Sequence, residues 1–269
     1  MDFHTLLAAL GNGDQPVSIS SDWSQGRAGF GGLMAALLYE AMRRRLAEQG
    51  LEGRPVRSLA ISFVAPAALQ VPTLFEVEVL RSGKSVVLVL GRALQNGEVV
   101  TLMQGSFGAA RSSRVGLTAM PAPEVQPPGQ CFKVGYREGV TPEYLRHLAL
   151  AWGIGGLPYS DTPSPAIGGW VRLEGEGQIA ALDEARVLAL VDAWPPALLP
   201  HLAAPAAGST LSWTIEFVQP MPTLPGDAWY KYRASIEHAA DGYGHTSAAL
   251  WTADDQLLAI SRQTVTVFG

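Results

Sequence analysis

The chain has 269 residues, of which 48% are hydrophobic and 16% charged, and its formal net charge is −5. This length suits two domains of ordinary size, and the apolar content is enough to give each of them a core. The mild negative charge argues against a nucleic-acid partner, and the single cysteine, Cys131, excludes an internal disulfide and a four-cysteine zinc site.

The N-terminus, residues 1–4, lacks the charged start and the long apolar stretch of a signal peptide. Nowhere does the sequence approach about 18 uninterrupted apolar residues, so no membrane-spanning helix is predicted. Together with the single cysteine, these features predict a cytoplasmic protein.

A long helix is predicted over residues 31–50, with the sequence GGLMAALLYEAMRRRLAEQG. It starts at Gly31 and Gly32 and carries no charge before Glu40. The basic run at residues 43–45 lies where this helix ends, and there Arg complements the helix dipole, so we interpret it as a helix-end or solvent-facing feature rather than a phosphate site. A helix that is apolar most of the way round must be enclosed by other elements.

Antiparallel strands are predicted between residues 75 and 107 from runs rich in Val, Ile, Leu and Thr. Asn96 and Gly97 lie between two such runs, and both tolerate positive φ, so this pair predicts a tight β-hairpin. A proline-rich tract at residues 118–130 then predicts an extended linker.

The C-terminal half contains a tract at residues 156–169 that is predicted as a loop from its Gly, Pro and Ser content. A second helix is predicted from about Ala181 to Trp194. Pro195 and Pro196 stop it, because proline disfavours the helical conformation at the preceding residue. Strand-rich sequence follows to the end of the chain.

The sequence contains an internal repeat. The segment ISFVAP, residues 61–66, returns as IEFVQP, residues 215–220, at an offset of 154. Each copy is preceded by one of the predicted helices and followed by strand-rich sequence. We therefore expect two similar halves on either side of the linker, residues 1–117 and 131–269, each an antiparallel sheet wrapped around one central helix.

Asp192 interrupts the apolar run of the second helix, in ARVLALVDAWPP at residues 185–196. Burying an ionised carboxylate costs several kcal/mol unless it is paired or hydrogen-bonded. A negative charge in the last turn of a helix also opposes the helix dipole. Asp192 is therefore either an exposed carboxylate near a helix end or the centre of a built site.

Asp192, Thr210 and Gln263 fall at positions where the first copy of the repeat has apolar side chains or none. The corresponding residues, at an offset of 154 for the first two and 158 for the third, are Leu38, Val56 and Gly105. Taken singly, Thr210 fits an ordinary strand threonine and Gln263 an edge-facing glutamine. Together, an acceptor, a hydroxyl and an amide can hold a water molecule and partly deprotonate it, which predicts a catalytic site.

These residues and the motifs around them resemble the acyl-CoA thioesterase II family of the double hot-dog superfamily, over nearly the whole chain. In the first half the resemblance rests on GFGGLMAALLYEA (29–41), FVAP (63–66), VEVLRSGKSVVLVLGRALQNGE (77–98) and GSF (105–107). In the second half it rests on VDAWPPAL (191–198), STLSWTIEFVQP (209–220) and LLAISRQ (257–263).

The resemblance implies an α+β fold, a double hot-dog in which two tandem repeats each wrap an antiparallel sheet around a central helix. It implies that the thioester of medium- or long-chain acyl-CoA is hydrolysed to a fatty acid and free CoA, with Asp192, Thr210 and Gln263 activating the attacking water. No metal or redox cofactor is implied, and a homodimer is the expected assembly.

The sequence departs from the family's pattern in two places. The family's Gly-Gly-Gln at the start of the first helix is Gly31, Gly32 and Leu33 here, so a polar group near the substrate is missing. Gly31 and Gly32 either present helix N-terminal N–H groups to a substrate oxygen or phosphate, or only allow close packing. Residues 131–170 match poorly, and acyl-chain selectivity is expected to lie there.

Two other functions compete with thioester hydrolysis. A non-catalytic module that binds acyl-CoA or mediates an interaction would show tight binding without turnover. A hydratase or dehydratase of the hot-dog type would need an Asp/His pair on the helix and its loop. The histidines of the second half do not fall there; they are His147, His201, His238 and His245.

Overall fold

The computed structural model describes residues 1–10, 15–175 and 180–268. The described α-helices are α1 (Phe3–Ala8), α2 (Gly31–Glu48) and α3 (Glu184–Asp192), with short 3-10 turns η1 (Ser21–Trp23), η2 (Glu143–Arg146) and η3 (Leu199–His201). The described strands are β1 (Val17–Ser18), β2 (Ser24–Gln25), β3 (Ala28–Gly29), β4 (Val56–Phe63), β5 (Pro72–Ser82), β6 (Val86–Gln95), β7 (Glu98–Gly108), β8 (Phe132–Val134), β9 (Leu148–Ile154), β10 (Ala166–Leu173), β11 (Ala207–Phe217), β12 (Tyr230–Ala240), β13 (Tyr243–Trp251) and β14 (Leu257–Phe268).

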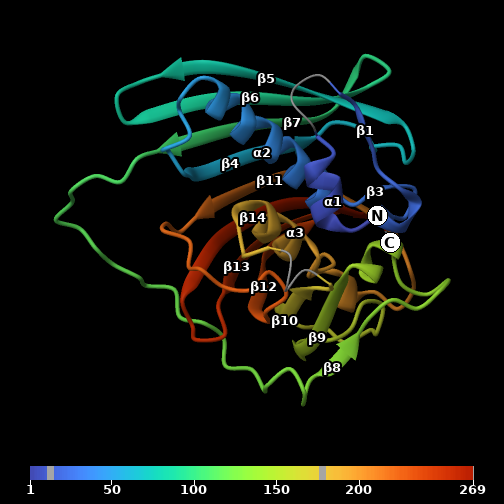
Figure 1. The fold of residues 1–269 in the computed structure, drawn as a ribbon. Coiled ribbons are helices and arrows are strands. Elements are labelled where there is room, and N and C mark those ends of the chain that lie inside the picture. Colours follow the sequence, from blue (N-terminus) through green and yellow to red (C-terminus); the bar gives the residue numbers. More distant parts are fainter. Residues whose placement is uncertain (11–14, 176–179, 269) are drawn as a thin grey trace.

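Twelve of these strands form one antiparallel sheet in the order β1-β5-β6-β7-β4-β11-β14-β13-β12-β10-β9-β8. The sheet curves around both α2 and α3, which pack against each other inside it (Figure 1). α2 lies on β5, β6 and β7, while α3 lies on β10, β13 and β14. This is the double hot-dog arrangement that the sequence predicts, with the two halves fused into one sheet.

The two halves meet where β4 pairs with β11. Ala60 of β4 pairs with Thr214 of β11, and these two residues are counterparts in the sequence repeat, at the offset of 154. The same offset converts the residue pair on one side of this position into the residue pair on the other side. The register therefore places a local two-fold axis at the Ala60–Thr214 pair, and the sequence repeat is also a repeat in space.

The elements with strong local signals form as predicted. α2 starts at Gly31 and ends at Glu48, and its side chains are buried over most of its length. Asn96 and Gly97 join β6 to β7 with φ values of 53° and 82°, which is the conformation that a two-residue hairpin requires. α3 is shorter than predicted at both ends, because Asp183 caps its start and the helix stops at Asp192.

The tract at residues 156–169 is not a loop throughout, so that prediction is wrong at its end. Residues 166–169 begin β10, which pairs with β12 and β9 and carries the sheet beyond β12. The glycines that suggested a loop instead allow the neighbouring strands to approach closely. A Cβ atom would lie 2.3 Å from the Tyr232 carbonyl oxygen at Gly168 and 2.1 Å from the Ala151 carbonyl oxygen at Gly169.

Residues 118–130 run without helix or strand along the outside of the C-terminal half. The indole of Trp170 donates to the Gln126 carbonyl at 2.8 Å, and that of Trp251 donates to the Met120 carbonyl at 3.3 Å. The domain boundaries drawn on either side of this segment stay a prediction. Of the helices that the structure describes, none has the length and apolar character needed to span a membrane.

Candidate active site

Asp192 is the last residue of α3, and its side chain is only 8% exposed. The helix begins where the Asp183 side chain accepts a hydrogen bond from the Arg186 backbone N–H at 2.8 Å, a standard N-cap. It ends three residues before Pro195. A helix of this length brings Asp192 to the N-terminus of α2, so the exposed alternative for this carboxylate is excluded.

Gln263 of β14 lies beside this carboxylate. Its side-chain amide Nε2 donates to Oδ1 of Asp192 at 3.0 Å. The register of β14 holds Gln263 opposite Trp213 of β11 and Thr246 of β13. The structure therefore brings together two of the three residues that the sequence singled out.

Thr210 reaches the inner face of the sheet through a β-bulge. Thr210 pairs with Val265 and Ser212 with Thr264, so Leu211 is an extra residue in β11. Residues paired across an antiparallel ladder share a face, and Val265 shares its face with Gln263. Without the bulge, Thr210 would point to the opposite face. Among the described residues its hydroxyl forms no hydrogen bond with Asp192 or Gln263.

The two glycines at the start of α2 face Asp192 directly. A Cβ atom at Gly31 would lie 2.9 Å from Oδ2 of Asp192 and 3.2 Å from the Phe63 ring, and one at Gly32 would lie 3.0 Å from Cβ of Asp192. These positions therefore allow close packing, and the first turn of α2 also points its free N–H groups to the same place. Leu33, where the family has Gln, is fully buried.

Burial raises the pKa of Asp192 to about 7, while the hydrogen bond from Gln263 and the backbone N–H of Gly32 lower it in part. No positively charged side chain contributes to this pKa. A carboxyl group with a pKa near neutrality is matched to accepting a proton from water at neutral pH.

Aromatic side chains that the sequence analysis missed enclose the carboxylate. The pKa values of Tyr144 and Tyr232 are raised by burial and by the charge of Asp192. Trp194 stacks on Tyr232, with ring centroids 5.1 Å apart, and its buried indole Nε1 has no hydrogen-bond partner among the described residues. Trp194 follows Asp192 closely enough to have been noticed, whereas the two tyrosines have no local signal.

A mainly apolar cavity of about 380 Å³ adjoins this aromatic wall. It is lined by parts of the segment 132–159 together with Pro195 and Leu199. Tyr144 belongs to its wall, and its hydroxyl donates to the carbonyl of Ala193, next to Asp192, at 2.9 Å. The cavity thus lies in the region where the sequence departs most from the pattern of the acyl-CoA thioesterase II family, which it resembles.

The positions in the first half that correspond to the polar trio are part of the core. Leu38 and Val56 are fully buried. A Cβ atom at Gly105 would lie 2.7 Å from the Phe107 ring and 3.3 Å from the sulfur of Met42. Within the described residues, no group of three or more His, Cys, Asp or Glu side chains could hold a metal ion.

Two family models match the chain. The model of the acyl-CoA thioesterase N-terminal domain matches residues 19–108, and the model of the acyl-CoA thioesterase C-terminal domain matches residues 118–267. No curated protein matches the sequence.

Several solved structures share the fold. A conserved protein with a hot-dog fold from Alicyclobacillus acidocaldarius has 22% identity and a TM-score of 0.83, over 99% of this chain and 98% of that one. The TesB protein of Mycobacterium avium subspecies paratuberculosis has 17% identity and a TM-score of 0.76, over 100% of both chains. The acyl-CoA thioesterase II TesB2 of Mycobacterium marinum has 22% identity and a TM-score of 0.70, over 94% of this chain and 91% of that one. At these identities the likeness establishes the fold.

The raised pKa of Asp192 predicts a pH-dependent gain in stability from Asp192→Asn. Because the folded state holds the proton more tightly than the unfolded chain, wild-type stability falls as the pH rises from about 4 to about 7. Asp192→Asn has no carboxylate to ionise, so its stability does not fall in this way. The difference in unfolding free energy between the variant and wild type should not change with pH below about pH 4 and should favour the variant most above about pH 7, by at most about 4 kcal/mol for three pKa units. Urea unfolding across this range measures it.

The exposed Asp254→Asn is the matched control and should show no such trend. A stability difference between Asp192→Asn and wild type that does not change with pH would contradict the assigned burial of the charge.

Proposed function

The chain belongs to the acyl-CoA thioesterase family, and from this premise we propose that it hydrolyses the thioester of acyl-CoA to a free fatty acid and CoA. Asp192 is the general base that takes a proton from the attacking water, and Thr210 and Gln263 orient that water and the carboxylate. The observation that carries the proposal is the 3.0 Å hydrogen bond from Gln263 to the buried carboxylate of Asp192. The cytoplasmic location and the homodimer expected from the sequence stay predictions.

In the proposed reaction, Asp192 accepts a proton as the water oxygen adds to the thioester carbonyl carbon. The carbonyl oxygen becomes an oxyanion, and the backbone N–H of Gly31 at the start of α2 is the proposed donor to it, while the N–H of Gly32 donates to Asp192. Collapse of the tetrahedral intermediate re-forms the carbonyl and breaks the carbon–sulfur bond. The proton on Asp192 then passes to the departing CoA sulfur, which restores the base.

The cavity of about 380 Å³ is the proposed site of the acyl chain. Its walls are mainly apolar, with Leu145, Leu150 and Trp152 among them, and such surface takes up hydrocarbon rather than the charged nucleotide of CoA. Its link to the reacting centre is Tyr144, which borders the cavity and donates to Ala193. This position supports a preference for medium- or long-chain substrates.

Replacing the base should abolish most of the activity. We expect Asp192→Asn to lower kcat/KM for palmitoyl-CoA by about 10²–10⁴-fold, the usual contribution of a positioned general base, while the protein stays folded. Thiol release measures the rate. Asp254→Asn, which removes an exposed carboxylate, should match the wild type. Full activity in Asp192→Asn would refute the assigned base, and tight binding of palmitoyl-CoA by a wild type without turnover would identify a binding module instead.

The pH profile tests the role of Gln263 separately. Since the ionised form of Asp192 is the active one, kcat/KM should rise with pH through an inflection near 7 and level off above it. The Gln263 hydrogen bond lowers the pKa of Asp192, so Gln263→Leu should move this inflection to higher pH as well as lowering the plateau. A reduced plateau with an unmoved inflection would mean that Gln263 does not act through Asp192.

Narrowing the apolar cavity should change the chain-length preference. Leu157 lines the cavity and is 36% exposed, so Leu157→Trp can fill space there with little effect on the core. We expect the ratio of kcat/KM for palmitoyl-CoA to that for hexanoyl-CoA to fall by about 10-fold or more. Leu74→Trp, on β5 away from the cavity and 45% exposed, is the control. An unchanged ratio in Leu157→Trp would remove the acyl chain from this cavity.

A further inference from the structure

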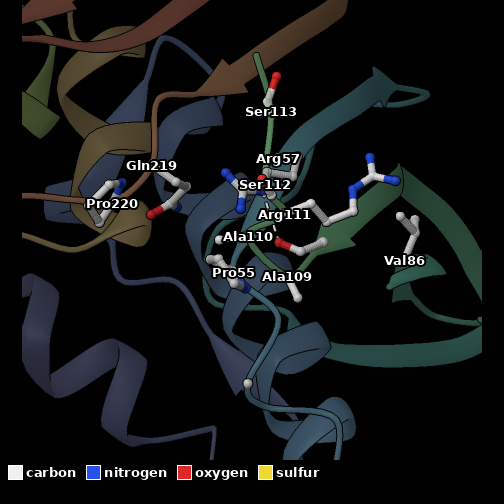
Figure 2. Close-up of a pocket in the computed structure, with 12 residues that line it drawn as sticks. Pro55, Arg57, Val86, Ala109, Ala110, Arg111, Ser112, Ser113, Gln219 and Pro220 are labelled. Atoms are coloured by element: carbon white, nitrogen blue, oxygen red, sulfur yellow. Dashed lines mark hydrogen bonds between the residues drawn. The ribbon is translucent and has the colours of Figure 1, made fainter. Parts of the chain in front are cut away.

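A larger cavity, of about 890 Å³, lies at the opposite end of β4 from Asp192 (Figure 2). It is lined by the segment that leads into β4, by residues 108–113 after β7, and by Gln219 and Pro220 after β11. Val56 lies at this end of β4, whereas Phe63 lies at the Asp192 end, roughly 23 Å away at about 3.3 Å per strand residue. The cavity is therefore separate from the candidate active site.

The local two-fold axis makes this cavity the counterpart of the surface beside Thr210. At the offset of 154, Arg57 in its wall corresponds to Leu211, the bulge residue next to Thr210. In the same way Gln219 corresponds to Ala65, just beyond the end of β4. The duplication thus relates the cavity at one end of the β4–β11 pair to the surface beside Thr210 at the other end.

This cavity leads to no catalytic carboxylate. Behind it, the Gln219 amide donates to the Glu184 carboxylate at 2.7 Å and to the Val56 carbonyl at 3.3 Å. The Tyr39 hydroxyl donates to the other oxygen of Glu184 at 3.2 Å. The Glu184 carboxylate is thus engaged by these two donors, and the position that corresponds to Asp192 is occupied by buried Leu38.

The cavity itself is positively charged. None of the described residues that line it carries a carboxylate, and Arg57 and Arg111 both belong to its wall. Nε of Arg57 donates to the Gly108 carbonyl at 2.9 Å, which fixes the guanidinium and leaves its two terminal nitrogens available. In Figure 2 this guanidinium stands on the Gln219 side and that of Arg111 on the Val86 side. Neither forms an ion pair with a described residue.

A third arginine lies next to the wall. Arg54 falls between Gly53 and Pro55, which line the cavity, and its Nη2 donates weakly to the Lys84 carbonyl at 3.5 Å. Its Nε is buried and has no hydrogen-bond partner within the part of the chain that the structure describes. Several arginine donors without acidic partners are the usual surroundings of phosphate groups. The volume is that of a whole small-molecule site rather than of a single phosphate.

We propose that this cavity is a second, non-catalytic site that binds the phosphate groups of a nucleotide, and that its ligand is CoA. The nucleotide class follows from the arginines and the volume. The choice of CoA rests on the proposed function, because the repeat relates the cavity to the surface beside Thr210, from which CoA would reach Asp192. CoA bound here is not exposed to a general base.

Calorimetric titration with CoA tests the proposal. We expect wild type to bind two CoA molecules per chain and Arg57→Gln/Arg111→Gln to bind one. Arg111→Gln alone changes an exposed side chain without hydrogen bonds, and should weaken the second site by about 10-fold or more without disturbing the fold. Arg81→Gln/Arg233→Gln removes the same charge from exposed sites outside the cavity and should keep both sites.

Two further ligands distinguish the source of the phosphate. Adenosine 3′,5′-bisphosphate should compete for the second site, whereas inorganic phosphate at the same concentration should not. Equal affinity for inorganic phosphate would overturn the nucleotide assignment, and two unchanged CoA sites in the double variant would overturn the location. Thiol release from acyl-CoA by wild type tests the proposed function independently. If wild type shows no turnover but the double variant still loses one CoA site, the proposed function is wrong and the second site stands.

Discussion

The antiparallel pairing of β4 with β11 determines where the functional groups of this chain lie. It fuses two sheets into one and sets the local two-fold axis at the Ala60–Thr214 pair. Because the two strands run in opposite directions, the end of β4 lies beside the bulged start of β11. The N-terminus of α2 consequently meets the C-terminal end of α3, and Gly31 lies beside the buried Asp192 although 161 positions separate them in sequence.

Asp192 combines two opposing electrostatic environments. As the last residue of α3 it lies at the negative end of that helix dipole, but it faces the positive end of α2. Among the described residues, the side chain that donates to it is the neutral amide of Gln263. A nearby Lys or Arg would lower the pKa and weaken the base. With burial opposed only by neutral donors, the pKa settles at about 7, which keeps a substantial ionised fraction at neutral pH.

Much of the fold could be predicted because its signals are local or repeated. The length of α2, the Asn96–Gly97 turn and the repeat each follow from a short stretch of sequence. What escaped prediction depends on contacts between distant segments. The glycines of β10 are required by neighbouring backbones and look like loop residues in isolation, and Tyr144 and Tyr232 meet Asp192 only after the sheet closes. The position of Gln263 could be predicted because the sequence repeat showed which residue of the first half it corresponds to.

Close packing couples Gly31 to Asp192 at one end of the β4–β11 pair. The space beside Gly31 is so small that a Cβ atom there would lie 2.9 Å from Oδ2 of Asp192. The counterpart of Gly31 at the other end is Ala185, whose side chain is buried. The counterpart of Asp192 there is Leu38, which is also buried. Gly31 and Asp192 are therefore coupled by packing, and at the other end of the β4–β11 pair Ala185 and Leu38 replace both members.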